Sequence, residues 1–173
     1  MASAGADRGE LGRGGRLPRS ARRKQLLAAA QQVFVANGYH AAAMDDIAER
    51  AGVSKPVLYQ HFPGKLELYL ALLDQSCDQI IGGMAKALDY TEDNKQRVAA
   101  TMTAFYEYVA SDEGAFRLVF ESDLTNEPLV TERVDRVTTE CADRIAPLIR
   151  DDTGLPAEHS QLLAVALVGM GQV

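Results

Sequence analysis

The segment AGVSKPVLYQHFPGK, residues 51–65, combines side chains that bind phosphate and base edges with the signals of a short helix. Lysine attracts phosphate, tyrosine and histidine donate hydrogen bonds to phosphate oxygens, and glutamine can read an adenine edge. Gly52 allows a sharp chain reversal, while Ser54 and Pro56 are typical of a helix start. The segment therefore predicts a helix whose outer face meets nucleic acid.

The residues expected on this outer face are adjacent or one helical turn apart. A single surface lysine is usually only a solvated charge, and a single histidine is more often structural, so the prediction depends on the combination. Lys65, just after the break at Pro63 and Gly64, is expected to hold the DNA backbone from the flank. The candidates on the helix itself are Lys55, Tyr59, Gln60 and His61.

Two helices are expected before this segment, at about residues 21–37 and 44–51. The first has apolar residues at the spacing of one helical face, an N-cap candidate in Ser20 and a stop at Gly38. The second has acidic residues in its first turn, where the helix dipole favours negative charge. The following helix ends at Phe62, and its Val57 is expected to face inward. Together with the second helix it is expected to form a helix-turn-helix.

Beyond residue 65 the sequence shows one amphipathic helical pattern after another, separated by turn compositions, and no alternating strand pattern longer than a few residues. The fold class expected is all-α. The predicted helices cover about residues 65–88, 95–110, 114–121, 127–150 and 157–173.

The charge distribution supports a division of the chain. Residues 1–65 hold ten Lys or Arg against five Asp or Glu, whereas residues 66–173 hold eight against nineteen. A basic part that meets a polyanion and an acidic part that does not would give this split. We expect a disordered, Gly- and Arg-rich basic arm at 1–18, a DNA-binding domain at 19–65 and a helical domain at 66–173.

Residues 22–73 resemble the N-terminal domain of the tetracycline-repressor (TetR) family of bacterial regulators, through the pattern A…F…GY…DIA…AGVS…LY.HF..K…L. The resemblance implies three DNA-binding helices, followed by a larger helical domain that forms a homodimer and binds a small inducer. It implies a repressor that leaves a palindromic double-stranded operator when the inducer binds. Beyond residue 74 the resemblance is only architectural.

Carried over by position, the resemblance makes Tyr59 and His61 phosphate contacts and Lys65 the clamp. It places Lys55, Val57 and Gln60 where such proteins touch bases, and Tyr39 in the core. Arg22 and Arg23 extend the basic arm into the first helix and are included as DNA contacts.

The start of the second helix departs from the family pattern. Ala43 stands where many relatives have Ser or Thr, and Asp45 stands where a basic residue is common. A hydroxyl cap and a phosphate contact are therefore both absent, and the arm is expected to supply part of the affinity.

A group of aromatic and methionine side chains marks the candidate ligand site. Five of the eleven aromatic residues fall within residues 105–120. Such a group can line an apolar cavity, although aromatics at helical spacing are more often ordinary core. The ligand expected is a small apolar or amphipathic molecule, bound by Met84, Met102, Phe105, Tyr108, Phe116 and Phe120.

The run QLLAVALVGMGQV at 161–173 is apolar all round, so it must be covered, and a second subunit is the natural cover. An ordinary core helix is the alternative. Because the sequence ends within this pattern, a final helix is expected to be missing.

The sequence offers no catalytic, metal or cofactor motif. His40, His61 and His159 have no metal-ligand spacing, and the two cysteines cannot form a CxxC pair. No signal peptide or membrane span is apparent, so a cytoplasmic protein is expected. The competing interpretation is a helical bundle that binds a small molecule, or is purely structural, without specific DNA binding.

Overall fold

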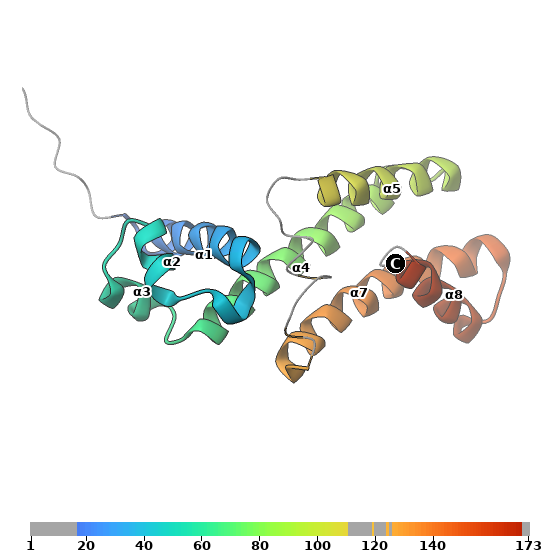
Figure 1. The fold of residues 1–173 in the computed structure, drawn as a ribbon. Coiled ribbons are helices and arrows are strands. Elements are labelled where there is room, and N and C mark those ends of the chain that lie inside the picture. Colours follow the sequence, from blue (N-terminus) through green and yellow to red (C-terminus); the bar gives the residue numbers. More distant parts are fainter. Residues whose placement is uncertain (1–16, 111–118, 120–123, 125, 171–173) are drawn as a thin grey trace, which may run out of the picture.

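The computed structural model describes residues 17–110, 119, 124 and 126–170, and these are helical with short connections (Figure 1). Strands are absent from this described part, in agreement with the all-α prediction. The helices are α1 (Arg19–Ala41), α2 (Met44–Arg50), α3 (Lys55–His61), α4 (Lys65–Asp89), α5 (Asn94–Ala110), α7 (Pro128–Thr153) and α8 (Ala157–Met170).

Three helices, α1 to α3, gather at one end of the molecule, and α4 leads from them to the other helices (Figure 1). Helix α1 packs on both α2 and α4. Gly38 interrupts α1 with a φ of 72°, so the regular helix ends at the predicted stop and residues 39–41 form a short turn beyond it. The expected N-cap of α1, Ser20, is wrong, because α1 begins at Arg19 and Pro18 occupies the N-cap position. Ser54 does occupy the N-cap position of α3, but its side chain makes no capping hydrogen bond.

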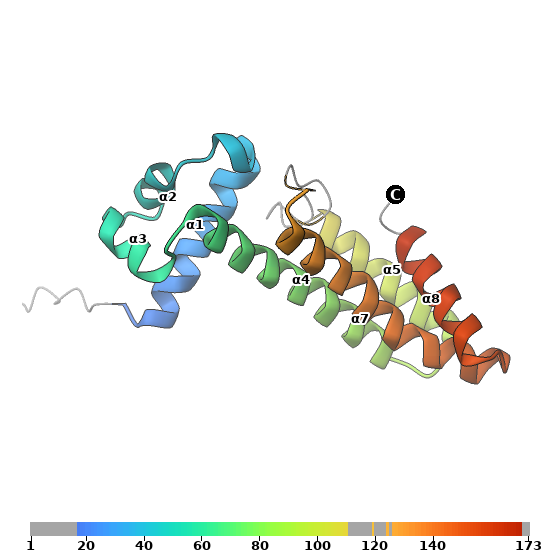
Figure 2. The same ribbon diagram turned by 90° about the horizontal axis from the view of Figure 1, so that it is seen from below.

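Helices α4, α5, α7 and α8 form the second part of the molecule. Helix α4 contacts both α5 and α7, and α8 packs on α7 (Figure 2). Two inter-helix ion pairs join α4 to α7, Asp74 with Arg133 at 3.0 Å and Asp78 with Arg136 at 2.8 Å. The predicted helix at 114–121 falls almost entirely outside the described residues, as do residues 1–16 of the predicted arm.

The main core runs without interruption from α1 to α7. Phe34 stacks with Tyr39 and meets Tyr69 of α4 edge to face, with ring centroids 5.1 Å apart. Tyr39 also contacts Tyr69, so the expectation that Tyr39 packs in the core is confirmed. Helix α4 therefore shares one continuous apolar core with α1.

Helix α4 contains two adjacent glycines near its centre, Gly82 and Gly83. A Cβ atom at either position would meet nothing within 4 Å. Packing therefore does not require glycine at these positions. Glycine in a helix interior makes the helix less stable than alanine does, by roughly 0.5–1 kcal/mol, so the pair weakens α4 locally.

Candidate DNA-binding face and ligand pocket

Helix α3 is set across α2 by a tight turn. Gly52 has a φ of +63°, and the amide of Val53 donates to the carbonyl of Ala48 at 3.0 Å. Leu58 and Phe62 are buried beneath α3. This burial fixes which side of α3 faces outward.

The outward side of α3, here called the α3 face, consists of residues whose side chains are exposed or half-buried. Tyr59 is 48% exposed, and Lys55 and Gln60 are also exposed. The expectation that Val57 turns inward is wrong, because Val57 is only half-buried and lies in a surface hollow beside α1. The α3 face is Lys55, Val57, Tyr59, Gln60 and His61.

Lys55 forms an ion pair that the sequence did not predict. Its ammonium lies 2.5 Å from a carboxylate oxygen of Asp45 in the first turn of α2, and this hydrogen bond raises the pKa of Lys55. Both side chains are more than half exposed. Asp45 therefore holds the amine of Lys55 at the edge of the face.

Arginines at the start of α1 approach the end of α3. Arg19 and Arg22 share a hollow with Gln60 and His61, and its volume is about 590 Å³. Partial burial lowers the pKa of His61, and the charges of Arg19, Arg23 and Arg22 lower it further. Arg19, Arg22 and Arg23, here called the arginine cluster, thus extend the α3 face with positive charge.

Two of these arginines are held in place. Arg22 donates to the side chain of Gln25 at 2.8 Å, and Gln25 in turn donates to the carbonyl of Ala51 at 2.7 Å. The guanidinium of Arg23 lies 4.4 Å from the centre of the Phe62 ring. The start of α1 is therefore tied to the turn between α2 and α3.

The ammonium of Lys65, which the sequence predicted to hold a DNA phosphate, forms hydrogen bonds within the protein. Its ammonium donates to the carbonyls of Tyr39, His40 and Ala42 at 2.8, 3.2 and 3.0 Å, and it lies 4.5 Å from the centre of the Tyr39 ring. An ammonium has three donors, and all three are engaged. In the structure Lys65 stabilises the turn after α1.

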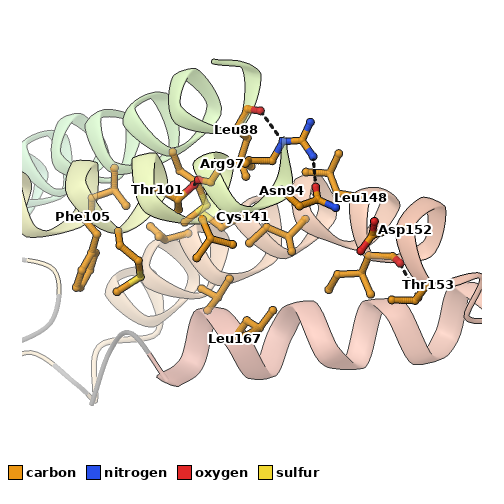
Figure 3. Close-up of a pocket in the computed structure, with 18 residues that line it drawn as sticks. Leu88, Asn94, Arg97, Thr101, Phe105, Cys141, Leu148, Asp152, Thr153 and Leu167 are labelled. Carbon is orange, nitrogen blue, oxygen red and sulfur yellow. Dashed lines mark hydrogen bonds between the residues drawn. The ribbon is translucent and has the colours of Figure 1, made fainter. Parts of the chain in front are cut away.

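An apolar pocket of about 360 Å³ lies among α4, α5, α7 and α8 (Figure 3). Its wall on α4 is formed by Ile80, Met84 and Leu88, which are spaced four residues apart and so share one side of the helix. Leu167 closes the pocket from α8. A cavity of this size and character suits a small apolar ligand.

Three of the predicted ligand-site residues, Met84, Met102 and Phe105, lie in the wall of this pocket. Tyr108 is not part of the described wall and packs instead against the main core. Phe116 and Phe120 lie outside the described residues.

The structure adds pocket residues that the search for aromatics missed. Val137, Cys141 and Ile145 contribute a stripe from α7. Their four-residue spacing is a signal that the sequence contained. Burial raises the pKa of the Cys141 thiol to about 11, so this wall stays uncharged at neutral pH.

One end of the pocket is polar. Asn94, Arg97, Asp152 and Thr153 gather there, opposite Phe105 (Figure 3). The Nε of Arg97 donates to the carbonyl of Leu88 at 3.0 Å, and its Nη1 donates to Asn94 at 2.6 Å. None of these four polar residues was singled out from the sequence.

The described residues contain no group of three or more His, Cys, Asp or Glu arranged to hold a metal ion. Cys77 and Cys141 are both buried and free. Among the helices described, none is long and apolar enough to cross a membrane.

Comparison with known proteins identifies relatives that match most of this chain. Residues 26–72 match the model of the bacterial regulatory proteins of the tetR family. The HTH-type transcriptional activator FasR of Mycolicibacterium smegmatis is 51% identical over 158 residues, which cover 91% of this chain and 72% of FasR.

Solved structures with the same fold include a TetR-like regulator from Rhodococcus sp. RHA1 (TM-score 0.74, 28% identity, 91% of this chain and 83% of that one). Another is the regulator FadR from Bacillus subtilis in complex with stearoyl-CoA (TM-score 0.68, 18% identity, 83% and 81%), a similarity that shows the fold alone. The match to the N-terminal model, the identity with FasR and the shared architecture together show that this chain belongs to the TetR family of bacterial transcriptional regulators, which are not enzymes.

Proposed function

We propose that this regulator binds a near-palindromic operator as a homodimer and that a long-chain acyl compound in the apolar pocket lowers its affinity for DNA. Residues 19–65 form the DNA-binding domain in this proposal, and residues 66–173 form the ligand-binding and dimerisation domain. The main support is that two sites meet on one helix, because α4 contacts α1 at one end and lines the pocket at the other.

The α3 face supplies the chemistry for reading DNA. The Gln60 amide suits an adenine edge in the major groove, and the Tyr59 hydroxyl suits a phosphate. The arginine cluster adds positive charge where α1 meets the end of α3. We therefore propose base contacts from Lys55, Val57 and Gln60 and phosphate contacts from Tyr59, His61, Arg22 and Arg23.

Helix α8 supports the homodimer. Its side chains Leu162, Leu163 and Leu167 are 68%, 45% and 50% exposed, and residues 162–170 contain no polar side chain. Exposed apolar surface of this kind marks an interface. A two-fold dimer would place two copies of α3 in successive major grooves, about 34–36 Å apart or a multiple of that distance.

The shape and lining of the pocket support an acyl ligand. Its wall is mainly aliphatic and its polar groups gather at one end, which suits a chain with a polar head. The FadR structure with the same fold contains stearoyl-CoA. We propose a long-chain fatty acid or its coenzyme A thioester as the effector.

Helix α4 provides the coupling. Ligand atoms against Ile80, Met84 and Leu88 would press on the same helix that carries Lys65. Lys65 holds the turn between α1 and α2, so a shift of α4 would move the DNA-binding helices. The ligand must bind the two positions of α4 with different affinity for this coupling to work.

We propose activation as the direction of control, in place of the repression expected from the family default. The relative at 51% identity is an activator. Loss of operator binding would then lower transcription. Transcription in vitro from a promoter with the selected site distinguishes the two directions. Added ligand should lower transcription if it releases an activator, and should raise transcription if it releases a repressor.

Selection of bound sequences from a random DNA pool tests the central proposal. We expect a site with dyad symmetry, and gel shifts with palmitoyl-CoA should then show weaker binding. Reciprocity requires DNA to weaken palmitoyl-CoA binding by the same factor, typically about 5- to 150-fold. Failure to enrich any sequence would favour a ligand-binding bundle without specific DNA binding.

A further inference from the structure

The polar end of the apolar pocket lies beside a second hollow. This polar hollow has a volume of about 480 Å³ and lies where the ends of α4 and α7 meet the start of α5. The pocket and the hollow share Leu88, Arg97 and Leu148. Arg97 is the one charged residue among the three, so its guanidinium lies at the boundary between the apolar pocket and the polar hollow.

Arg97 is positioned rather than free to turn away. Its guanidinium donates to one backbone carbonyl and one side-chain amide, of Leu88 and Asn94, and both acceptors are neutral. The hydroxyl of Thr101 donates to the backbone carbonyl of Arg97 at 2.9 Å. The full positive charge is thus fixed at the boundary between apolar and polar space.

Neither Arg97 nor Arg144, the second arginine of the hollow, forms an ion pair with any carboxylate in the described part of the chain. Asp89 and Glu92 line the hollow and Asp152 lines the polar end of the pocket, but none of the three forms a described ion pair with these guanidinium groups. Two arginines without a counter-ion beside an apolar chamber are suited to a carboxylate or phosphate, which guanidinium groups bind through paired hydrogen bonds.

We propose that Arg97, assisted by Arg144, binds the anionic head group of the effector, so that the protein selects charged acyl compounds over neutral ones of equal chain length. The inference rests on the proposed acyl ligand of the same pocket. The charge could come from the carboxylate of a free fatty acid or from the phosphates of a coenzyme A thioester. The fatty acid carries its anion directly at the end of the apolar chain, whereas in the thioester the pantetheine arm separates the phosphates from the chain.

Calorimetric titration of the full chain with palmitate, palmitoyl-CoA and hexadecanol tests the proposal. Arg97→Met keeps an apolar stem and removes the charge, and Arg144→Met does the same in the hollow. Lys95→Met is the matched control, because Lys95 is exposed, has the same charge and lies two residues from Arg97 without lining either space. Circular dichroism checks that every variant is folded.

We expect the wild type to bind a charged probe at least about ten-fold more tightly than hexadecanol. Arg97→Met should weaken the charged probe by about 10- to 100-fold and leave hexadecanol unchanged, since a hydrogen bond to a charged group is lost. Lys95→Met should bind all three probes like the wild type. If Arg144→Met weakens only palmitoyl-CoA, Arg144 binds the phosphates of the thioester, and if it weakens palmitate equally, Arg144 assists binding of either anion.

The contrary results are distinct. Equal binding of hexadecanol and the charged probes, unaffected by Arg97→Met, would overturn the head-group role and leave the acyl pocket standing. An effect of Arg97→Met with none of Arg144→Met would remove Arg144 from the proposal. Binding of none of the three probes would overturn both the head-group role and the proposed acyl ligand.

Discussion

Replacing Lys65 with methionine is expected to destabilise the protein rather than only to weaken phosphate binding. The ammonium makes three hydrogen bonds to carbonyls and one ring contact in the turn after α1. Methionine keeps much of the apolar stem but none of the donors. The carbonyls of Tyr39 and Ala42 would then be left partly shielded from water.

The magnitude follows from these contacts. A hydrogen bond from a charged donor contributes about 1.5–3 kcal/mol when buried. Because Lys65 is only half-buried, we take about 0.5–1 kcal/mol for each of the three bonds, reduced by solvent screening. The cation–ring contact adds about 0.5 kcal/mol. The free energy of unfolding should therefore fall by about 2–3.5 kcal/mol.

Urea unfolding followed by circular dichroism measures this change, and gel shifts over a series of salt concentrations measure DNA binding in parallel. With an m-value of about 2 kcal/mol/M, the midpoint should fall by about 1–1.8 M. Lys24→Met is the control, because Lys24 is an exposed lysine of the same helical domain. An unchanged midpoint, with a salt slope lowered by about 0.9 per subunit, would refute the structural role and restore the phosphate clamp.

Four further changes test other parts of the structure. DNA affinity should rise as the pH falls from about 7.5 to 6. In the free protein, burial and the neighbouring arginine charges lower the pKa of His61, and a bound phosphate would raise this pKa again, so DNA binding takes up a proton. His61→Gln should flatten this pH dependence. Asp45→Asn should release Lys55 and steepen the salt slope of non-specific binding by up to about 0.9, and an equal effect from its unpaired neighbour Asp46→Asn would contradict the role of the ion pair. Leu162→Glu should shift the dimer toward monomer in analytical ultracentrifugation, whereas Tyr106→Glu on α5 should not. Gly82→Ala should stabilise α4 by roughly 0.5–1 kcal/mol and reduce the effect of the ligand on DNA affinity; an unchanged ligand response would show that flexibility at this site is not used.

Local signals in the sequence predicted the first three helices well. Gly38 and Gly52 have the positive φ that marks their turns, and the break at Pro63 and Gly64 separates α3 from α4. These features depend on residues within a few positions of one another. The boundaries of α4, α5 and α7 were likewise within a few residues, since amphipathic spacing and turn residues define them.

Contacts between distant residues could not be predicted in the same way. Lys65 looks like an exposed cation in the sequence, and only the fold brings the carbonyls of residues 39–42 to it. The pairing of Lys55 with Asp45 likewise depends on the angle between α2 and α3. The partners of a long polar side chain are set by tertiary geometry, which composition and spacing do not determine.

The pocket shows the same limit. The search favoured aromatic residues, yet aliphatic side chains on α4 and α7 form much of the wall. Arg97 resembles any surface arginine in the sequence, and its bond to the carbonyl of Leu88 becomes visible only when α4 and α5 are packed together. Periodicity could have indicated the apolar stripes, but not that a cavity would remain between them.

The length of α4 sets how large a ligand-induced movement must be. At about 1.5 Å per residue, its 25 residues form a rod about 37 Å long. A tilt of about 5° at the pocket end would carry the Lys65 end through about 3 Å, by simple geometry from this length. In the proposed dimer the two-fold axis would relate the movements of the two α4 helices, so that both recognition helices shift together toward or away from the axis. The spacing between the recognition helices would then change by up to about 6 Å, compared with the 34–36 Å period of the grooves. A tilt of α4 by only a few degrees at the pocket would therefore misalign both recognition helices with their half-sites in the proposed dimer.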